Sequence, residues 1–441
     1  MIIIYSIILF FFINSISLVK CGILSVRLIP VLFIIYIAAN LFPSLGSRKL
    51  RSRRLRICEG GCTLLCIFLF TSVITIFYSL FAWTRILPMA NSVPGIWIGN
   101  TICAILMEAV LFWNGILRIY FTSIQLGLKF RILGIICGFI PIINLVVLVY
   151  MIYIVHEEVI YENQKMLLNE GRKEQAVCKT KYPLLLVHGV FFRDSRFFNY
   201  WGRIPKELLE NGAVIFYGEH QSAASVEESG KELADRIRYL TEQTGCEKVN
   251  IIAHSKGGLD CRYAVSELGI ADKVASLTTI NTPHRGCEFA DYLLSKIPAK
   301  QKETIAQTYN KSLKKLGEPN PDFLAAVQDL TYGACRERNE RIEDAESVYY
   351  QSVGSCLNVA KGGRFPLNFT YCLVEYFDGK NDGLVGEKSF PWGAEYKYLT
   401  VRGKRGISHG DMIDLNRENF PDFDVREFYV QLVHDLKKRG L

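Results

Sequence analysis

Five long apolar runs lie in the first third of the chain, and they constrain its architecture more than any other feature. Each run carries almost no charge and approaches or exceeds the roughly 18–20 residues that a membrane-spanning helix needs. They cover residues 2–19, 28–45, 61–83, 95–117 and 132–155. Five consecutive runs of this length leave no polar face for a soluble domain. The sequence therefore predicts an all-α transmembrane region of about five helices in residues 1–155.

The charges between these runs predict which way the helices cross the membrane. Cytoplasmic loops carry an excess of Lys and Arg, and the connection between the second and third runs holds six basic residues within residues 48–56. Arg118, Lys129 and Arg131 lie between the fourth and fifth runs, whereas Glu157, Glu158 and Glu162 follow the fifth. Five spans therefore predict a multi-pass protein of the cell membrane. The N-terminus is expected in the cytoplasm, and the chain after the fifth run is expected to be extracytoplasmic.

Charge and cysteine content argue against a nucleic-acid-binding protein and against a disulfide-rich scaffold. The formal net charge of +8 is largely explained by the clusters beside the membrane runs, and no nucleic-acid-binding motif appears. Seven of the thirteen cysteines follow residue 156, an odd number without the C-x-x-C spacing of metal sites. We therefore expect no nucleic-acid partner and no disulfide scaffold, while the oligomeric state stays open.

The pattern changes after the last apolar run. Residues 156–178 form a charged, helical linker by their composition, and residues 179–441 alternate between strand-like and helical stretches. The predicted strands cover residues 183–187, 213–217, 248–252 and 275–280, and the predicted helices cover residues 225–244 and 257–267. Such alternation is typical of a parallel, mostly buried sheet flanked by helices. The sequence thus predicts an α/β domain over residues 179–441.

A tight turn follows one of these strands at Ser255. Residues 249–258 read Val-Asn-Ile-Ile-Ala-His-Ser-Lys-Gly-Gly, a small-x-Ser-x-Gly pattern in which Ala253 takes the place of the commoner glycine. This is the layout of a nucleophile elbow, where a strand delivers a serine and the following helix points its N-terminus at the reacting group. A serine that merely caps the helix is the alternative.

An upstream strand leads into a loop that is expected to supply an oxyanion-hole donor. Residues 182–190 read Tyr-Pro-Leu-Leu-Leu-Val-His-Gly-Val, a buried strand that ends in His-Gly. In hydrolases with a nucleophile elbow, one oxyanion-hole N–H comes from the loop after this strand and the other from the residue after the serine. The backbone N–H groups of Val190 and Lys256 are therefore the predicted oxyanion donors. We assign His188 no catalytic role.

Two downstream loops carry the remaining candidates in the order Ser, Asp, His that this fold requires. Asp382 lies in a polar turn after a β-like run over residues 369–377. His409 lies in a loop between a predicted strand, residues 396–401, and a terminal amphipathic helix, residues 425–436. An ordinary Asn-Asp-Gly turn and a solvated loop histidine are the alternatives.

Together these segments resemble the bacterial triacylglycerol lipases of the Pseudomonas type, within the α/β-hydrolase superfamily. The matching blocks are residues 181–183, 188–189, 200–205, 249–258, 283–286 and 381–386, and nothing before about residue 178 takes part. The resemblance implies an α/β-hydrolase fold. It also implies that Ser255 is the nucleophile, Asp382 the acid and His409 the base, with Val190 and Lys256 as oxyanion donors.

The same resemblance implies a lid and raises the question of a metal. Residues 287–356 read as helical and amphipathic, and in lipases this position carries a lid or cap; a surface insertion without gating is the alternative. Lipases of this family often hold a structural calcium between a carboxylate just after the histidine and another about twenty residues before the acid. Asp411 matches the first, but residues 364–375 offer no aspartate for the second. No cofactor is therefore required by the sequence.

These features combine into one functional prediction. The chain is expected to be a membrane-anchored serine hydrolase, a lipase or esterase that cleaves carboxylic esters of lipids, with the lipid substrate and the membrane as its partners. An acyltransferase or phospholipase with the same triad stays open, because an acyl-enzyme can pass its acyl group to an alcohol. A catalytically silent membrane scaffold is the other alternative, and the complete set of catalytic residues argues against it.

Overall fold

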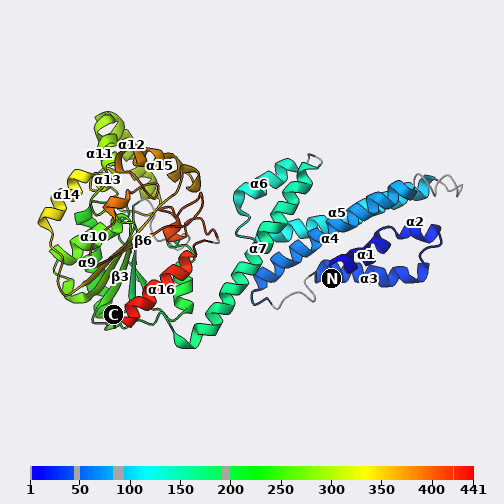
Figure 1. Cartoon of the computed structure of the whole chain (residues 1–441), viewed down its shortest axis with the longest axis horizontal. Helices are drawn as coiled ribbons and strands as arrows, with labels where there is room; N and C mark the ends of the chain where they lie inside the picture. Colours follow the sequence, from blue (N-terminus) through cyan, green and yellow to red (C-terminus); the bar gives the residue numbers. More distant parts are fainter. Residues whose placement is uncertain are drawn as a thin grey trace. The chain divides into compact units, whose positions relative to one another are not determined.

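The computed structural model describes residues 2–43, 50–82, 94–138, 140, 142–190, 199–420 and 422–441. The chain divides into two compact units, Met1–Glu170 and Gly171–Leu441, which we call the helical unit and the α/β unit (Figure 1). The division falls inside the segment predicted as a linker, where the last helix of the helical unit continues to Arg172. Each unit is described separately.

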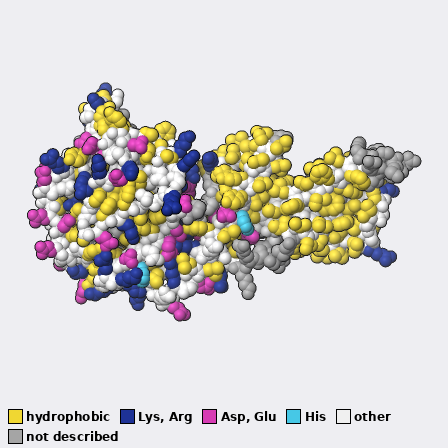
Figure 2. Space-filling view, viewed as in Figure 1, with side chains coloured by type: hydrophobic (Ala, Val, Ile, Leu, Met, Phe, Trp, Pro, Cys, Tyr) yellow, Lys and Arg dark blue, Asp and Glu magenta, His cyan; other side chains and the backbone are white. Residues whose placement is uncertain are grey.

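Among its described residues, the helical unit contains three helices that are long and apolar enough to cross a membrane. Its helices are α1 (Ile2–Ile13), α2 (Ser15–Lys20), α3 (Ile29–Leu41), α4 (Arg53–Phe81), α5 (Pro94–Thr122), α6 (Gly127–Cys137) and α7 (Ile143–Arg172). The three long ones are α4, α5 over Gly95–Thr122, and the helix that begins at Ile143. Hydrophobic side chains cover most of the visible face of this unit (Figure 2), as Phe77 and Phe121, 70% and 83% exposed, illustrate. A surface of this kind is suited to lipid rather than water.

Two of the five predicted runs are interrupted in the structure. The first run divides into α1 and α2 at Asn14, whose side-chain amide donates to Thr75 Oγ1 (2.9 Å) while its carbonyl oxygen accepts from Asn100 (3.1 Å). The fifth run, residues 132–155, divides between α6, which ends at Cys137, and α7, which begins at Ile143. The prediction of one continuous fifth helix is therefore wrong.

The start of α4 and the chain just after α5 meet at Glu158 in the middle of α7, and Glu158 is 1% exposed. Its carboxylate accepts hydrogen bonds from Arg54 Nη1 at the start of α4, and from Ser123 Oγ (2.5 Å) and Ile124 N (3.0 Å) just after α5. Arg54 belongs to the basic segment 48–56 and Glu158 to the acidic residues that follow the fifth run, and the two form an ion pair.

The α/β unit is built on a six-stranded parallel sheet with the order β2-β1-β3-β4-β5-β6. The strands are β1 (Leu184–Val187), β2 (Ile215–Tyr217), β3 (Val249–His254), β4 (Val274–Ile280), β5 (Tyr349–Ser355) and β6 (Glu395–Leu399). The four strands predicted in the first half are confirmed within two residues at each end. β1, β3 and β4 are buried along their whole length, as continuous apolar strands of a covered parallel sheet should be.

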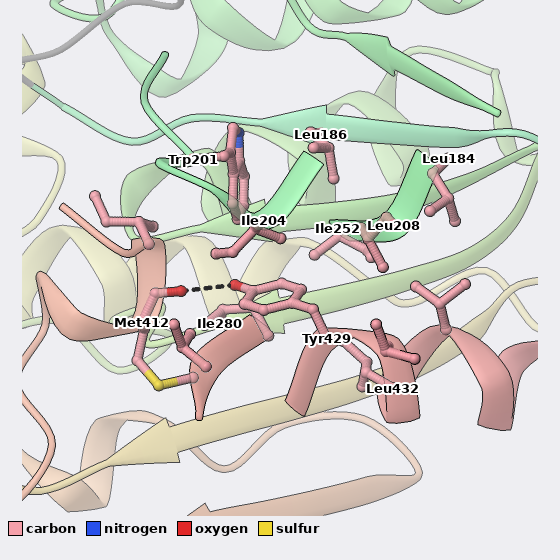
Figure 3. Packing of buried hydrophobic residues seen from close by; sticks show 14 of the residues in the cluster. Leu184, Leu186, Trp201, Ile204, Leu208, Ile252, Ile280, Met412, Tyr429 and Leu432 are labelled. Carbon is pink, nitrogen blue, oxygen red and sulfur yellow. Dashed lines mark hydrogen bonds between the residues drawn. The ribbon is translucent and has the colours of Figure 1, made fainter. Parts of the chain in front are cut away.

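Helices cover the sheet and form a hydrophobic core with it (Figure 1). The framework helices are α8 (Ile204–Glu210), α9 (Val226–Thr244), α10 (Lys256–Glu267) and α16 (Val425–Lys438). Figure 3 shows one core cluster, in which Tyr429 of α16 packs with Trp201, Ile252 and Ile280. The buried Tyr429 hydroxyl donates to Met412 O (3.0 Å), so its polar end is satisfied inside the apolar core.

Two sequence predictions in the second half of this unit are corrected. The run 369–377 is helical, within α15 (Leu367–Asp378), because Leu367, Tyr371 and Val374 repeat at helical spacing on its buried side. The proposed lid segment 287–356 contains α11 (Glu288–Lys296), α12 (Ala299–Lys315), α13 (Phe323–Gln328) and α14 (Tyr332–Arg341), and then β5 of the sheet. Its predicted end was therefore too late, since β5 lies between β4 and β6.

Candidate active site

Ser255 lies in a strained turn between β3 and α10, with φ 56° and ψ −132°. A non-glycine residue with positive φ costs on the order of 1–3 kcal/mol, and such strain is concentrated at functional sites. The surrounding backbone holds the turn: Ser255 N donates to Ile280 O (2.9 Å), and Thr282 Oγ1 donates to Ser255 O (2.8 Å). A Cβ at Gly257 would lie 2.3 Å from His188 O, which explains why only glycine fits there.

Asp382 is completely buried, and both of its carboxylate oxygens accept hydrogen bonds. Leu384 N and Val385 N donate to Oδ1 (2.9 and 2.8 Å), while His409 Nδ1 lies 2.6 Å from Oδ2. These hydrogen bonds fix the orientation of the carboxylate. The structure thus brings two sequence-predicted residues, Asp382 and His409, into direct contact.

The neighbouring aspartates have other partners. Asp378, at the end of α15, accepts hydrogen bonds from Glu288 N (3.0 Å) and Phe289 N (3.3 Å) at the start of α11. Negative charge at a helix N-terminus is favourable. Asp378 therefore has a structural role that Asp382 lacks, and only Asp382 of the two contacts His409.

His409 is oriented from its backbone and from one ring face. Its N–H donates to Asp382 O (2.9 Å), and its ring centroid lies 4.5 Å from that of His254. His254 immediately precedes Ser255 and is itself fixed by Tyr200 Oη at 2.7 Å from Nδ1. The imidazole of His409 is therefore held against the residue that precedes the candidate nucleophile.

Asn281 is a site residue that the sequence reasoning missed. Its side-chain amide donates to Asp382 Oδ2 (2.6 Å) and to Ser355 Oγ (2.7 Å), and its φ is 48°, a conformation that asparagine tolerates better than most residues. Asn281 directly follows β4. Its place at the carboxyl end of a central strand was the available signal, since functional side chains collect at that edge of a parallel sheet.

Both predicted oxyanion donors belong to segments that lie next to Ser255. Val190 follows Gly189, where an added Cβ would lie 2.7 Å from Ser255 Cβ, so the chain after β1 approaches the nucleophile closely. The Lys256 side chain turns into the protein, where Nζ donates to Asp260 Oδ1 (2.6 Å) and Ser229 Oγ (3.1 Å). Lys256 thus contributes only backbone to the surroundings of Ser255.

Burial shifts the proton affinities of several groups around this site. Burial raises the pKa of Asp260 to about 7, although the nearby Lys256 ammonium lowers it. Burial also lowers the pKa of His254 well below 6.5, and the neighbouring His409 lowers it further. His254 is therefore a neutral ring that positions its neighbours rather than a base that exchanges protons with water.

Asp411, the candidate calcium ligand, does not fit that role here. Arg405 Nη1 and Nη2 donate to its two oxygens (2.7 and 3.0 Å), and Ser408 N and Oγ both donate to Oδ2 (2.8 Å each). Within the described residues, no group of three His, Cys, Asp or Glu side chains is arranged to hold a metal ion. The Arg405 guanidinium is bonded to both oxygens of the carboxylate that a metal cation would need as a ligand.

The surroundings of Arg405 also oppose a cation. A cleft of about 320 Å³ at this place is lined by Val359, Lys361, Gly362, Gly363, Arg364, Lys404, Arg405 and Glu418. Four of these side chains are basic and one is acidic, so the lining carries a net positive charge. Glu418 is itself paired with Arg405 (2.9 Å) and with Arg364.

The lid-like helices are attached to the body of the α/β unit by polar contacts. Val226 N, at the start of α9, donates to Asp329 Oδ2 (2.6 Å), and Asp322 N donates to Ala223 O (2.5 Å). Leu330 packs against the buried Val226 and Leu259. The segment from α13 to α14 therefore closes on α9 and α10, beside the elbow.

Comparisons with known proteins agree with this geometry. Residues 182–394 match the family described as alpha/beta hydrolase fold. A triacylglycerol lipase of Vibrio cholerae is 28% identical over 61% of this chain and 91% of that protein. A triacylglycerol lipase of Pseudomonas fragi is also 28% identical, over 59% of this chain and 98% of that protein.

A solved structure is similar as well. The Staphylococcus hyicus lipase is 19% identical, with a TM-score of 0.47, over 59% of this chain and 97% of that chain. The sequence relatives, rather than this structure, carry the assignment. The α/β unit of this chain therefore has the α/β-hydrolase fold, and the chain is similar in sequence to bacterial triacylglycerol lipases.

Proposed function

We propose that the chain is a membrane-anchored lipid ester hydrolase that works through an acyl-enzyme on Ser255. The observation that carries this proposal is the 2.6 Å contact between Asp382 Oδ2 and His409 Nδ1, beside a serine in a strained nucleophile elbow. An imidazole oriented by an acid, close to a serine in a nucleophile elbow, is the arrangement that acyl transfer needs.

The mechanism follows from these positions. His409 accepts the Ser255 hydroxyl proton through Nε2 as the serine oxygen attacks the ester carbonyl, and Asp382 holds the ring in the tautomer with Nδ1 protonated. The N–H groups of Val190 and Lys256 stabilise the oxyanion, each by about 3 kcal/mol of barrier in comparable sites. His409 then protonates the leaving alcohol, and water resolves the acyl-enzyme.

Lipids are the substrate class that the rest of the chain favours. Three of the described helices are long and apolar enough to anchor the chain in a bilayer, and the relatives in the comparison are triacylglycerol lipases. The lid-like helices expose apolar side chains, among them Tyr309 and Leu316, 44% and 76% exposed. An apolar cover over the serine would form an acyl-chain groove, and its movement would gate the site.

A chain-length series tests the proposal. Membranes that carry the full chain should hydrolyse medium and long acyl esters, and the rate should rise when the substrate forms aggregates. Ser255→Ala membranes provide the background, and the substitution should reduce hydrolysis by about 10^3-fold or more. Ser266→Ala, near the far end of the same helix α10, is the matched control and should retain activity. Hydrolysis confined to acetyl and butyryl esters would instead identify a short-chain esterase.

A further inference from the structure

We infer that the α/β unit lies on the cytoplasmic side of the membrane and takes its lipid substrates from the cytoplasmic leaflet. The substrate part of this inference rests on the proposed function. The side of the membrane follows independently from contacts inside the helical unit, from the loop charges and from the cysteines. This orientation is the reverse of the one that the sequence predicted.

Helix α7 runs antiparallel to α4 and passes the start of α4 at Glu158. Cys62 Sγ lies 3.7 Å from Ile152 O, and one or two turns further along α7 Glu158 pairs with Arg54. Beyond it, Arg51 pairs with Glu170 (3.2 Å). The chain therefore enters the α/β unit from the helix end at which α4 begins.

Other contacts assign the remaining helix ends. Asn114 Nδ2 and Arg118 Nη2, near the end of α5, both donate to Asn40 O near the end of α3 (2.9 and 3.0 Å). At the other end of the unit, Tyr78 Oη donates to Ser17 Oγ (3.0 Å), close to the end of α4. The ends of α3, α5 and α7 and the start of α4 thus share one side, and the turn after α2 lies at the opposite side.

The basic residues are distributed unequally between these two ends. By sequence, the segments at the Arg54 end hold Arg48, Lys49, Arg51, Arg53, Arg54, Arg56, Arg118, Lys129 and Arg131. The segments at the opposite end hold Lys20, Arg27 and Arg85. Since cytoplasmic loops carry the excess of Lys and Arg, the end with nine basic residues is cytoplasmic. The α/β unit follows from that end.

The interruption of the fifth run explains why a count of five spans predicted the opposite side of the membrane for the α/β unit. Helix α6 has 11 residues and is therefore about 16 Å long, whereas a bilayer core is about 30 Å thick. Helix α6 begins shortly after Ser123 and Ile124, which both donate to Glu158, and Arg131 Nη2 of α6 donates to Ser123 O (2.6 Å). The chain thus enters α6 and leaves α7 at the same end. Although α7 is long and apolar enough to span, its contact at Glu158 fixes its exit side.

The cysteines support a reducing compartment. All thirteen are free thiols, and five of those in the α/β unit are buried: Cys178, Cys261, Cys287, Cys335 and Cys356. Disulfides are rare in cytosolic proteins and form readily in proteins of oxidising compartments. A domain with seven unpaired cysteines is suited to the cytoplasm.

The exposed Cys372 on α15 provides a test in the full chain. Cells that express the protein are treated with a membrane-impermeant maleimide, before and after permeabilisation, and Cys372→Ser gives the background. We expect labelling of Cys372 only after permeabilisation. Ser25→Cys, at an exposed position between α2 and α3 in a Cys372→Ser chain, should be labelled in intact cells. Labelling of Cys372 in intact cells, or of Ser25→Cys only after permeabilisation, would overturn the inference.

An activity measurement separates this inference from the proposed function. Inverted membrane vesicles should hydrolyse an added impermeant ester micelle at least tenfold faster than right-side-out vesicles, because their cytoplasmic face is exposed. Equal absence of hydrolysis in both would reject the proposed function, while the labelling result would still decide the side of the membrane. Faster hydrolysis by right-side-out vesicles would reject the cytoplasmic placement itself.

Discussion

A single oxygen, Oδ2 of Asp382, lies 2.6 Å from His409 Nδ1 and also 2.6 Å from the side-chain nitrogen of Asn281. The amide therefore holds the carboxylate oxygen that orients the imidazole. Asn281 reaches this position from the end of β4 in a left-handed backbone conformation. The acid of the proposed triad is positioned by a strand that neither Asp382 nor His409 belongs to.

The first prediction concerns this amide. Asn281→Gly removes the donor but tolerates the positive φ, and we expect kcat to fall roughly 10–100-fold with little change in KM, as for a lost hydrogen bond to a charged group. Asn281→Asp should be worse, since two carboxylates would face each other. Steady-state ester hydrolysis measures both. Ser355→Ala removes the other partner of the same amide and should have a small effect; equal losses in both variants would assign Asn281 a structural role.

The second prediction separates two neighbouring aspartates. Asp382→Asn should reduce kcat on the order of 10^4-fold, because a neutral amide stabilises the wrong imidazole tautomer. Asp378→Asn, four residues earlier, weakens only the charge at the start of α11 and should retain most activity. A larger loss in Asp378→Asn than in Asp382→Asn would show that the acid has been misassigned.

The third prediction concerns the guanidinium that pairs with Asp411. Breaking a buried ion pair costs roughly 3–5 kcal/mol, and somewhat less here because the Arg405 side chain is 28% exposed. Arg405→Ala should therefore lower the Tm and the activity of the full chain, and Arg405→Lys should recover part of both. A chelator should change neither Tm nor activity of the wild type. Loss of stability on chelation would instead identify a bound metal.

The fourth prediction concerns stability in acid. Burial, together with Arg262 and Arg285, lowers the pKa of His284 well below 6.5. Below about pH 6.5 the unfolded chain binds a proton that the folded chain does not. Stability is therefore present above this pH and is lost as the pH falls, by about 1.4 kcal/mol per pH unit for one proton.

Denaturant unfolding of the full chain at pH 7.5, 6.5 and 5.5 measures this dependence. His284→Gln should have a shallower slope than the wild type in the acidic range, whatever its stability at pH 7.5. His434→Gln, on the outer helix α16, is the control. Parallel slopes for wild type and His284→Gln would show that His284 does not carry the effect.

The sequence by itself determined the features that depend on local pattern. Uniform apolarity located the long apolar helices, and continuous apolar strands followed by small-residue turns located β1, β3 and the elbow at Ser255. The order of Ser255, Asp382 and His409 along the chain was also readable. These signals are local because burial and tight turns restrict residue type at each position directly.

Only the tertiary structure decided the relationships between distant segments. Local pattern could not reveal that Asn281 donates a hydrogen bond to Asp382, or that Arg405 pairs with Asp411. Each contact depends on how the folded chain brings loops and strand ends together. It also mistook the run 369–377 for a strand, since aromatic residues suit both elements. Arg54 and Glu158, which form a pair, are 104 residues apart in sequence, so the pattern of charges along the chain could not reveal that they meet.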